Sequence, residues 1–102
     1  MFGKMGDMMG KLQEMKKKAD EMKQKLDDTV LSVEGAGGDI KIEINGNRQV
    51  KSITVSPALQ HGDKATLEKE LLTAINMAIE QANQLNEEEM KKAASGLLPG
   101  MI

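Results

Sequence analysis

The chain has 102 residues with one aromatic side chain and no cysteine, and its formal net charge is −2 at pH 7. This length favours a single domain, and the lack of cysteine excludes disulfides, thiol catalysis and cysteine-ligated zinc. A slightly acidic chain has no general attraction for nucleic acid, so any such binding must be local. No stretch has the length of a signal-peptide core or a membrane span, which predicts a cytoplasmic protein without membrane association.

Residues 1–28 are predicted to form a helix, because apolar side chains recur at alternating steps of four and three residues. This heptad spacing is typical of a helix that packs against another helix. Three glycines within the first ten residues each weaken a helix by about 1 kcal/mol relative to alanine, so the firm part should begin at Lys11. We call the apolar row the Met seam, and its positions are Met1, Met5, Met8, Leu12, Met15, Ala19, Met22 and Leu26.

Residues 40–56 are predicted to form a β-hairpin. Ile40, Ile42 and Ile44 alternate with polar residues, which is the two-residue period of a strand with one buried face. Asn45-Gly46 follows at once, and this pair favours a two-residue turn in which both residues have positive φ. The chain should therefore reverse at this pair and return as a second strand over residues 49–56.

The returning strand has an irregular apolar spacing. Val50 and Ile53 are three residues apart, which predicts a bulge near Lys51 and Ser52. A further short strand is predicted upstream, and the glycine-rich residues 35–38 connect it to the hairpin. Residues 29–56 should thus form a three-stranded antiparallel meander.

Residues 63–94 are predicted to form a second long helix, with Asp63 as its N-terminal cap. Its apolar stripe is broad enough for burial against a core, and Ser95-Gly96 should end the helix and leave residues 95–102 as a mobile tail. The stripe consists of Leu67, Leu71, Leu72, Ala74, Ile75, Ala78, Ile79, Ala82 and Leu85. The predicted fold is a single α+β domain in the order α-β-β-β-α, with a small sheet flanked by two long helices.

Element lengths predict a homodimer. Helices of about 25 to 30 residues extend roughly 37 to 45 Å, whereas strands of five to seven residues extend about 17 to 23 Å, so each helix should overhang the sheet by about half. The overhangs, Met5 to Met15 and Ala78 to Leu85, carry apolar residues that a second copy can cover. The alternative is that the two helices cover each other within one chain. The predicted interface residues are Met5, Met8, Leu12, Met15, Ile40, Ile42, Ile75 and Ile79.

Five segments occur in a specific order: VEGAGG at 33–38, IKIEING at 40–46, VKSITVSP at 50–57, LLTAINMAI at 71–79 and GLLPG at 96–100. Together with the Met- and Lys-rich N-terminal helix, they resemble the YbaB/EbfC family of small nucleoid-associated proteins. The resemblance covers almost the whole chain. It implies an α/β/α homodimer whose paired helices project like tweezers, and a protein that binds DNA, alters its conformation and influences nucleoid organisation and gene expression.

Enzymatic chemistry finds little support in the sequence. His61, the single histidine, lies in a connector with no nucleophile pattern beside it. The glycine-rich stretch 35–38 lacks the helix and the Lys-Ser/Thr end of a phosphate-binding loop, although a small-molecule site there is a rival interpretation. The consecutive acids 87–89 point in different directions on a helix and cannot close on one metal ion. The sequence therefore predicts no catalytic residue, metal, cofactor or small-molecule substrate.

Basic side chains are left as candidates for DNA contact. They would bind sugar-phosphate and recognise shape and charge, because no segment resembles a known recognition helix. The candidates are Lys16, Lys17, Lys18, Lys23, Lys25, Arg48, Lys51, Lys91 and Lys92. Two alternatives remain: these residues are solvating charges balanced by nearby acids, or the protein is a dimeric protein–protein interaction module in which DNA association is incidental.

Overall fold

The computed structural model describes the backbone of residues 2–97 and the side chains of residues 8–95. Its elements follow the predicted order, and the three strands form one antiparallel sheet in the order β1-β2-β3. They are α1 (Phe2–Asp28), β1 (Val30–Gly35), the 3₁₀ helix η1 (Ala36–Gly38), β2 (Ile40–Asn45), β3 (Val50–Val55), α2 (Pro57–Gln60) and α3 (Lys64–Leu97). The predicted α+β class is confirmed.

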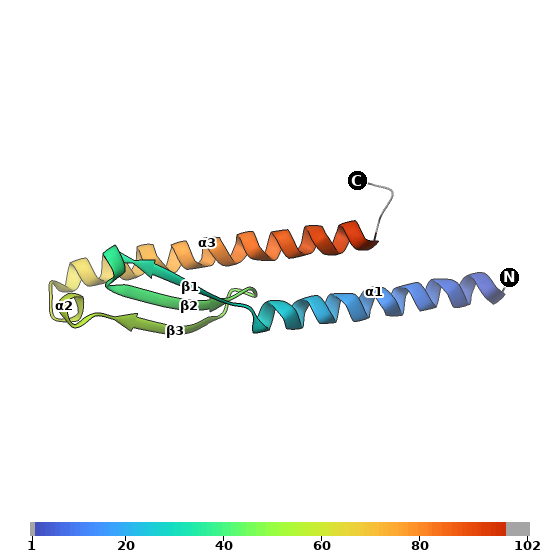
Figure 1. Cartoon of the computed structure of the whole chain (residues 1–102), viewed down its shortest axis with the longest axis horizontal. Coiled ribbons are helices and arrows are strands. Elements are labelled where there is room, and N and C mark those ends of the chain that lie inside the picture. Colours follow the sequence, from blue (N-terminus) through green and yellow to red (C-terminus); the bar gives the residue numbers. More distant parts are fainter. Residues whose placement is uncertain (1, 98–102) are drawn as a thin grey trace.

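The core lies between the sheet and α3. Ile40, Ile42 and Ile44 of the central strand are each 0% exposed, which confirms the predicted alternation. They pack against a row of small α3 residues at a spacing of four, and alanine at each of these positions lets the helix axis approach the sheet closely. The α3 row is Ala74, Ala78 and Ala82. Figure 1 shows α3 along the sheet, whose opposite face carries no helix.

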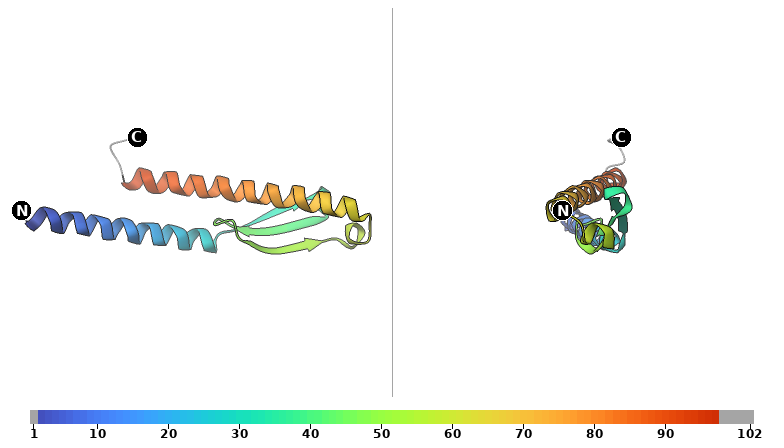
Figure 2. Two further views of the ribbon diagram at one scale, coloured as in Figure 1. Left: turned by 180° about the vertical axis from the view of Figure 1, so that it is seen from behind. Right: turned by 90° about the vertical axis from the view of Figure 1, so that its left-hand side faces the viewer.

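The two long helices relate to the sheet unequally, and the molecule is 71 Å long but only 24 by 17 Å across. α3 covers the sheet with its first half and then continues past it (Figure 2). α1 meets the sheet only at its C-terminal end and extends away from it as an arm. The expectation that each helix overhangs by about half therefore holds for α3 alone. Ala78 and Ala82, expected in the overhang, are buried in the core.

The arm is fixed to the sheet by a close backbone approach at its last turn. The Gly46 amide donates to the carbonyl oxygens of Leu26 at 2.9 Å and Thr29 at 3.1 Å. A Cβ at Gly46 would lie 2.6 Å from Leu26 Cδ2 and 3.1 Å from the Leu26 carbonyl oxygen. Leu26 is only 2% exposed. Glycine is required here because a larger residue would push α1 away.

The β2–β3 turn is longer than predicted. The Arg48 amide donates to the Asn45 carbonyl at 3.0 Å, and positive φ occurs at Arg48 (66°), so the prediction of a two-residue turn with positive φ at Asn45 and Gly46 is wrong. The fully buried Asn45 side chain organises this turn, because its Oδ1 accepts from the amides of Asn47 and Gln49 at 3.0 and 2.9 Å. This pattern is a β-turn followed by one left-handed residue.

Several local predictions are tested by the backbone. Ser52 pairs with Glu43 and Val50 with Ile44, which leaves Lys51 without an opposite residue and confirms the bulge. Asp63 caps α3 by accepting from the Thr66 amide at 3.1 Å, as predicted.

α1 ends at Asp28 and α3 begins after Asp63, as predicted, but other helix boundaries differ from the predicted ones. α1 is helical from Phe2, through the three glycines, and the predicted connector after β3 contains the short helix α2. α3 continues to Leu97, so Ser95-Gly96 does not end it. The rest of the predicted tail, residues 98–102, lies outside the described residues.

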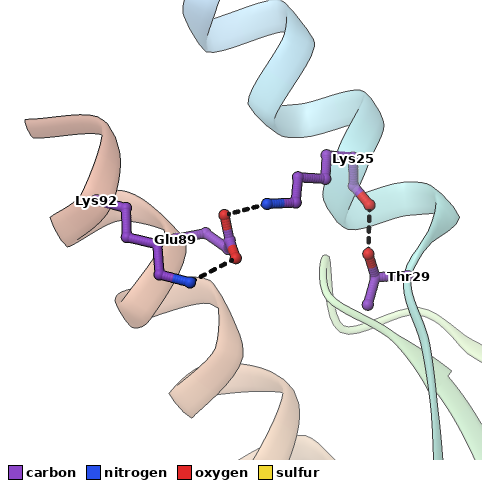
Figure 3. A network of polar contacts seen from close by, with 4 residues as sticks. All are labelled: Lys25, Thr29, Glu89 and Lys92. Carbon is purple, nitrogen blue, oxygen red and sulfur yellow. Dashed lines mark hydrogen bonds and ion pairs between the residues drawn. The ribbon is translucent and has the colours of Figure 1, made fainter. Parts of the chain in front are cut away.

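One polar network ties the arm to α3 (Figure 3). The Lys25 ammonium contacts Glu89 Oε2 at 2.9 Å, Lys92 contacts Glu89 Oε1 at 3.6 Å, and the Thr29 hydroxyl donates to the Lys25 carbonyl at 2.7 Å. The pKa of Glu89 is lowered, first by the hydrogen bond from Lys25 and then by the charges of Lys25 and Lys92, while partial burial opposes the shift. The Glu89 carboxylate therefore binds one lysine of each long helix and links α1 to α3.

Replacing Gly46 by alanine should destabilise the fold by about 1 to 3 kcal/mol, because the added Cβ overpacks the contact with Leu26. Gly10→Ala is the matched control, since nothing lies within 4 Å of its Cβ position and alanine should stabilise α1 by about 0.5 to 1 kcal/mol. Urea unfolding at one protein concentration measures both variants. Equal stability of the two variants would contradict the close approach.

The contact between Lys25 and Glu89 should depend on pH. Because the pKa of Glu89 is lower in the folded state than its ordinary value of 4.5, its stabilising contribution is present above pH 4.5 and is lost as pH falls through the folded value. Glu89→Gln should therefore be less stable than the native chain at pH 7 and equally stable near pH 3, as measured by urea unfolding. Glu88→Gln, an exposed neighbour, is the control, and an identical pH profile for both variants would remove Glu89 from the contact.

Candidate nucleic-acid interface

The lysines of α1 do not form one face. A helix turns about 100° per residue, so the consecutive Lys16, Lys17 and Lys18 point in three directions. Residues seven apart lie on one side, which places Lys16 with Lys23 on one flank of the Met seam and Lys18 with Lys25 on the other. These four lysines therefore lie on two flanks, and Lys17 lies on the outer side of the arm.

The two flanks differ in how far acids neutralise them. Lys18 pairs with Glu14 at 3.5 Å and Lys25 pairs with Glu89, whereas Lys11 on the same flank forms no ion pair among the described residues. Among the residues that the structure describes, Lys16, Lys17 and Lys23 form no ion pair, and all three are exposed. Most of the unpaired positive charge of the arm therefore lies on the Lys16 and Lys23 flank and on its outer side.

A groove of about 400 Å³ opens where α1 and α3 meet. Lys18 and Lys25 reach it from α1, and Lys92 reaches it from α3, so three of the predicted cations converge there. Two acids also line it, Glu21 and Glu89, which leaves three positive against two negative charges. Lys91 is exposed on α3 and does not line this groove.

Arg48 and Lys51 lie at the sheet end from which the arm extends. The Arg48 guanidinium donates to Asn83 Oδ1 of α3 at 3.1 Å, which holds it against the helix. Lys51 is the exposed bulge residue of β3. All nine basic candidates thus lie on the two projecting helices or at the sheet end next to them, although the chain as a whole is acidic.

The prediction that Ile40 and Ile42 lie in the dimer interface is wrong. Ile40 and Ile42 are 0% exposed within one chain, so they have no surface to offer a partner. Sequence periodicity identifies an apolar strand face but not whether α3 or a second molecule covers it. Ile75 and Ile79, by contrast, are half-buried at the edge of the core.

An uncovered apolar surface, missed by the sequence analysis, continues from Ile75 and Ile79. We call it the β3 face, and it consists of Val50 (42% exposed), Ile53 (44%), Leu72 (63%), Ile75 and Ile79. Val50 and Ile53 pair with Ile44 and Ile42, so they lie on the core side of the sheet. A helix about 10 Å wide covers only two strands that are spaced about 4.8 Å apart. The widths of these elements could therefore have predicted that the third strand stays uncovered.

The Met seam becomes more exposed with distance from the junction. Leu26 is buried and Met22 half-buried, whereas Met15 is 49%, Leu12 62% and Met8 65% exposed. Within the described residues, pairing of the two helices inside one chain is therefore limited to the turn around Met22. The side chain of Met5 lies outside the described residues.

The remaining motifs have structural explanations. A Cβ at Gly35 would lie 2.7 Å from Ala74 Cβ, and Gly37 and Gly38 have positive φ, so packing and backbone geometry explain this glycine-rich loop. His61 is exposed after α2. In the described part of the chain, no three potential ligands cluster as a metal site. Over the same residues, no helix has the length and apolar character needed to cross a membrane.

Comparison with known proteins gives consistent matches over most of the chain. A nucleoid-associated protein of Hahella chejuensis is 34% identical over 95 residues, which cover 93% of this chain and 88% of that protein. One from Anaeromyxobacter dehalogenans is 37% identical over 76 residues, covering 72% and 74%. The crystal structure of the uncharacterized protein HP0035 from Helicobacter pylori matches with a TM-score of 0.73 at 25% identity and covers 89% of this chain and 92% of that one.

The family model for the YbaB/EbfC DNA-binding family matches residues 1–97. This match spans nearly the entire chain, and it agrees with the full-length relatives and with the shared fold. The chain belongs to the YbaB/EbfC DNA-binding family.

Proposed function

We propose that this protein binds duplex DNA as a homodimer in the nucleoid, where it alters DNA conformation and influences gene expression. The observation that carries the proposal is the α1 arm, which presents exposed lysines beyond the sheet: Lys16, Lys17 and Lys23, without ion pairs among the described residues. Membership of a DNA-binding family supports the same function.

The proposed binding mode is contact with the sugar-phosphate backbone. Lysine ammonium groups neutralise phosphates and release counterions, so affinity falls as salt rises. With about four to eight phosphate contacts, the plot of log K against log salt should have a slope of roughly −4 to −7. Because Lys16, Lys17 and Lys18 point to different sides of the arm, one duplex cannot engage all three equally. Recognition is then mainly of shape and charge.

The proposed dimer uses the β3 face. Val50, Ile53 and Leu72 are large apolar residues at 42 to 63% exposure, and burying such a side chain contributes about 1.5 to 3 kcal/mol when it is complete. In a two-fold dimer each contact occurs twice, so a small surface gains enough to offset the entropy of association. Ile75 and Ile79 stay part of this interface. The sequence prediction that Met5, Met8, Leu12 and Met15 also contact the second copy is not part of this proposal.

Replacing Lys16, Lys17 and Lys18 together by glutamate should weaken duplex binding about tenfold or more at low salt. It should also make the salt slope shallower by about one unit for each phosphate that the arm no longer neutralises. Fluorescence anisotropy with a labelled duplex across a salt series measures both quantities. Lys41→Glu/Lys64→Glu/Lys69→Glu is the matched control, because it changes the net charge equally on the sheet and the first turns of α3. Equal weakening in both triple variants would point to net charge alone and not to the arm.

Replacing Ile53 by glutamate should convert the dimer into a folded monomer, because it places a charge at the centre of the β3 face. Sedimentation equilibrium at micromolar concentration measures the mass, and circular dichroism monitors folding. Thr54→Glu on the opposite face of the same strand should remain dimeric. A native chain that sediments as a monomer would refute the dimer, and a dimeric Ile53→Glu variant would exclude the β3 face.

A further inference from the structure

The Met seam of α1 carries lysine on both of its flanks. One flank has lysine directly before every second seam position, since Lys11, Lys18 and Lys25 precede Leu12, Ala19 and Leu26. On the other flank, Met9, Lys16 and Lys23 directly follow the alternate seam positions Met8, Met15 and Met22. Flanking residues of a heptad seam determine which helix can pair with it, because they lie beside the partner's own flanks. This arrangement therefore restricts the partner by charge.

The apolar part of this surface is continuous and open. Met8, Met9, Leu12 and Met15 cover two helical turns and are 65, 62, 62 and 49% exposed. Single exposed apolar residues are ordinary, but a contiguous apolar strip with a charged rim is typical of a binding surface. The strip is shaped for a helix, because its spacing is that of a helix–helix contact.

A second copy of α1 is a poor partner for the strip. In a parallel pair, the Lys18 flank of each helix faces the Lys23 flank of the other helix. This brings lysines such as Lys18 and Lys23 together. In an antiparallel pair like flanks face each other, and lysine again meets lysine. Like charges in both orientations disfavour self-pairing, which is how coiled coils select against wrong partners.

The rest of this chain does not match the strip either. Within residues 86–95, the distal part of α3 carries three glutamates, but Met90 is its one exposed large apolar residue, so it has no heptad row that could cover the strip. Residues 98–102 contain no acid that could face the flanking lysines. The matching partner is therefore a helix from another molecule.

The junction contains one example of the chemistry that fits. Lys25 is a flanking lysine beside the buried Leu26, and it is bound at 2.9 Å by Glu89 of the helix that packs there. The Glu89 side chain is only 12% exposed. An acidic residue beside an apolar contact is thus how this arm already binds a neighbouring helix.

We propose that the strip of Met8, Met9, Leu12 and Met15, with its flanking lysines, is a docking face for an acidic amphipathic helix of another protein. The partner helix has apolar residues at heptad spacing to cover the strip. It has glutamate or aspartate on both sides to meet Lys11 and Lys18 on one flank and Lys16 and Lys23 on the other. This surface is separate from the β3 face, but it shares Lys16 and Lys23 with the proposed DNA contact.

The test uses the full chain and two labelled synthetic heptad peptides. Both peptides have leucine at the seam positions, but one has glutamate and the other lysine at every flanking position. Fluorescence anisotropy should show saturable binding of the glutamate peptide that weakens with salt, and at least tenfold weaker binding of the lysine peptide. No binding of the glutamate peptide, or equal binding of both peptides, would overturn the proposal.

Variants locate the binding surface. Leu12→Gln should weaken binding of the glutamate peptide at least tenfold while helicity is retained, and Met77→Gln on α3 should bind normally, because Met77 is an exposed methionine outside the strip. Lys16→Glu/Lys23→Glu should shift the preference towards the lysine peptide. Unchanged preference in that variant would overturn charge selection.

Two other occupants would also overturn the proposal. If Leu12→Gln abolishes dimerisation in sedimentation, the strip is a contact between copies of this chain. If phosphatidylserine vesicles bind the native chain in a Leu12-dependent manner and the glutamate peptide does not, the strip is a membrane face.

Discussion

The close approach of Gly46 to Leu26 is the contact on which the rest of the structure depends. Its backbone hydrogen bond of 2.9 Å leaves no room for a Cβ, and it fixes the last turn of α1 against the β2–β3 turn. Asn45 supports it from inside, because its buried amide organises the same turn. The direction in which α1 leaves the sheet is therefore set by one glycine and one asparagine.

That direction explains how an acidic chain can belong to a DNA-binding family. If α1 lay on the open face of the sheet, its lysines would sit beside Glu34 and Glu43. As an arm, α1 carries Lys16, Lys17 and Lys23 away from the sheet, and the same geometry leaves the Met seam exposed. The α1 surface thus has two properties, unpaired positive charge and an apolar strip, that follow from a single junction. The β3 face arises separately, from a helix that is too narrow to cover three strands.

Periodicity was sufficient for the elements and for much of the core. The alternation of Ile40, Ile42 and Ile44, the bulge at Lys51 and the Asp63 cap are local patterns, and the structure confirms them. Contacts between segments that are distant in the sequence leave no local pattern. The Asn45-Gly46 pair therefore suggested a turn with positive φ, whereas glycine is needed at position 46 because Leu26 approaches it closely.

The candidate site could be predicted only in part for the same reason. The lysines could be named, but their ion pairs depend on partners such as Glu89, 64 residues from Lys25. Likewise, Ile40 and Ile42 were assigned to a dimer interface because an apolar strand face does not reveal which element covers it. Whether Lys16, Lys17 and Lys18 share a face, by contrast, could have been worked out from the helix period alone.

The most direct test is an electron spin distance between labels at Gln13→Cys on α1 and Thr54→Cys on β3, since the chain has no cysteine of its own. Dilution with unlabelled protein restricts the signal to one protomer. About 20 Å of helix and about 16 Å of strand separate the two sites, so a fixed arm predicts a narrow distribution near 35 Å. A distance below about 20 Å would mean that α1 folds back onto the sheet, and a broad distribution would mean that the junction does not hold the arm. Either result would contradict the account.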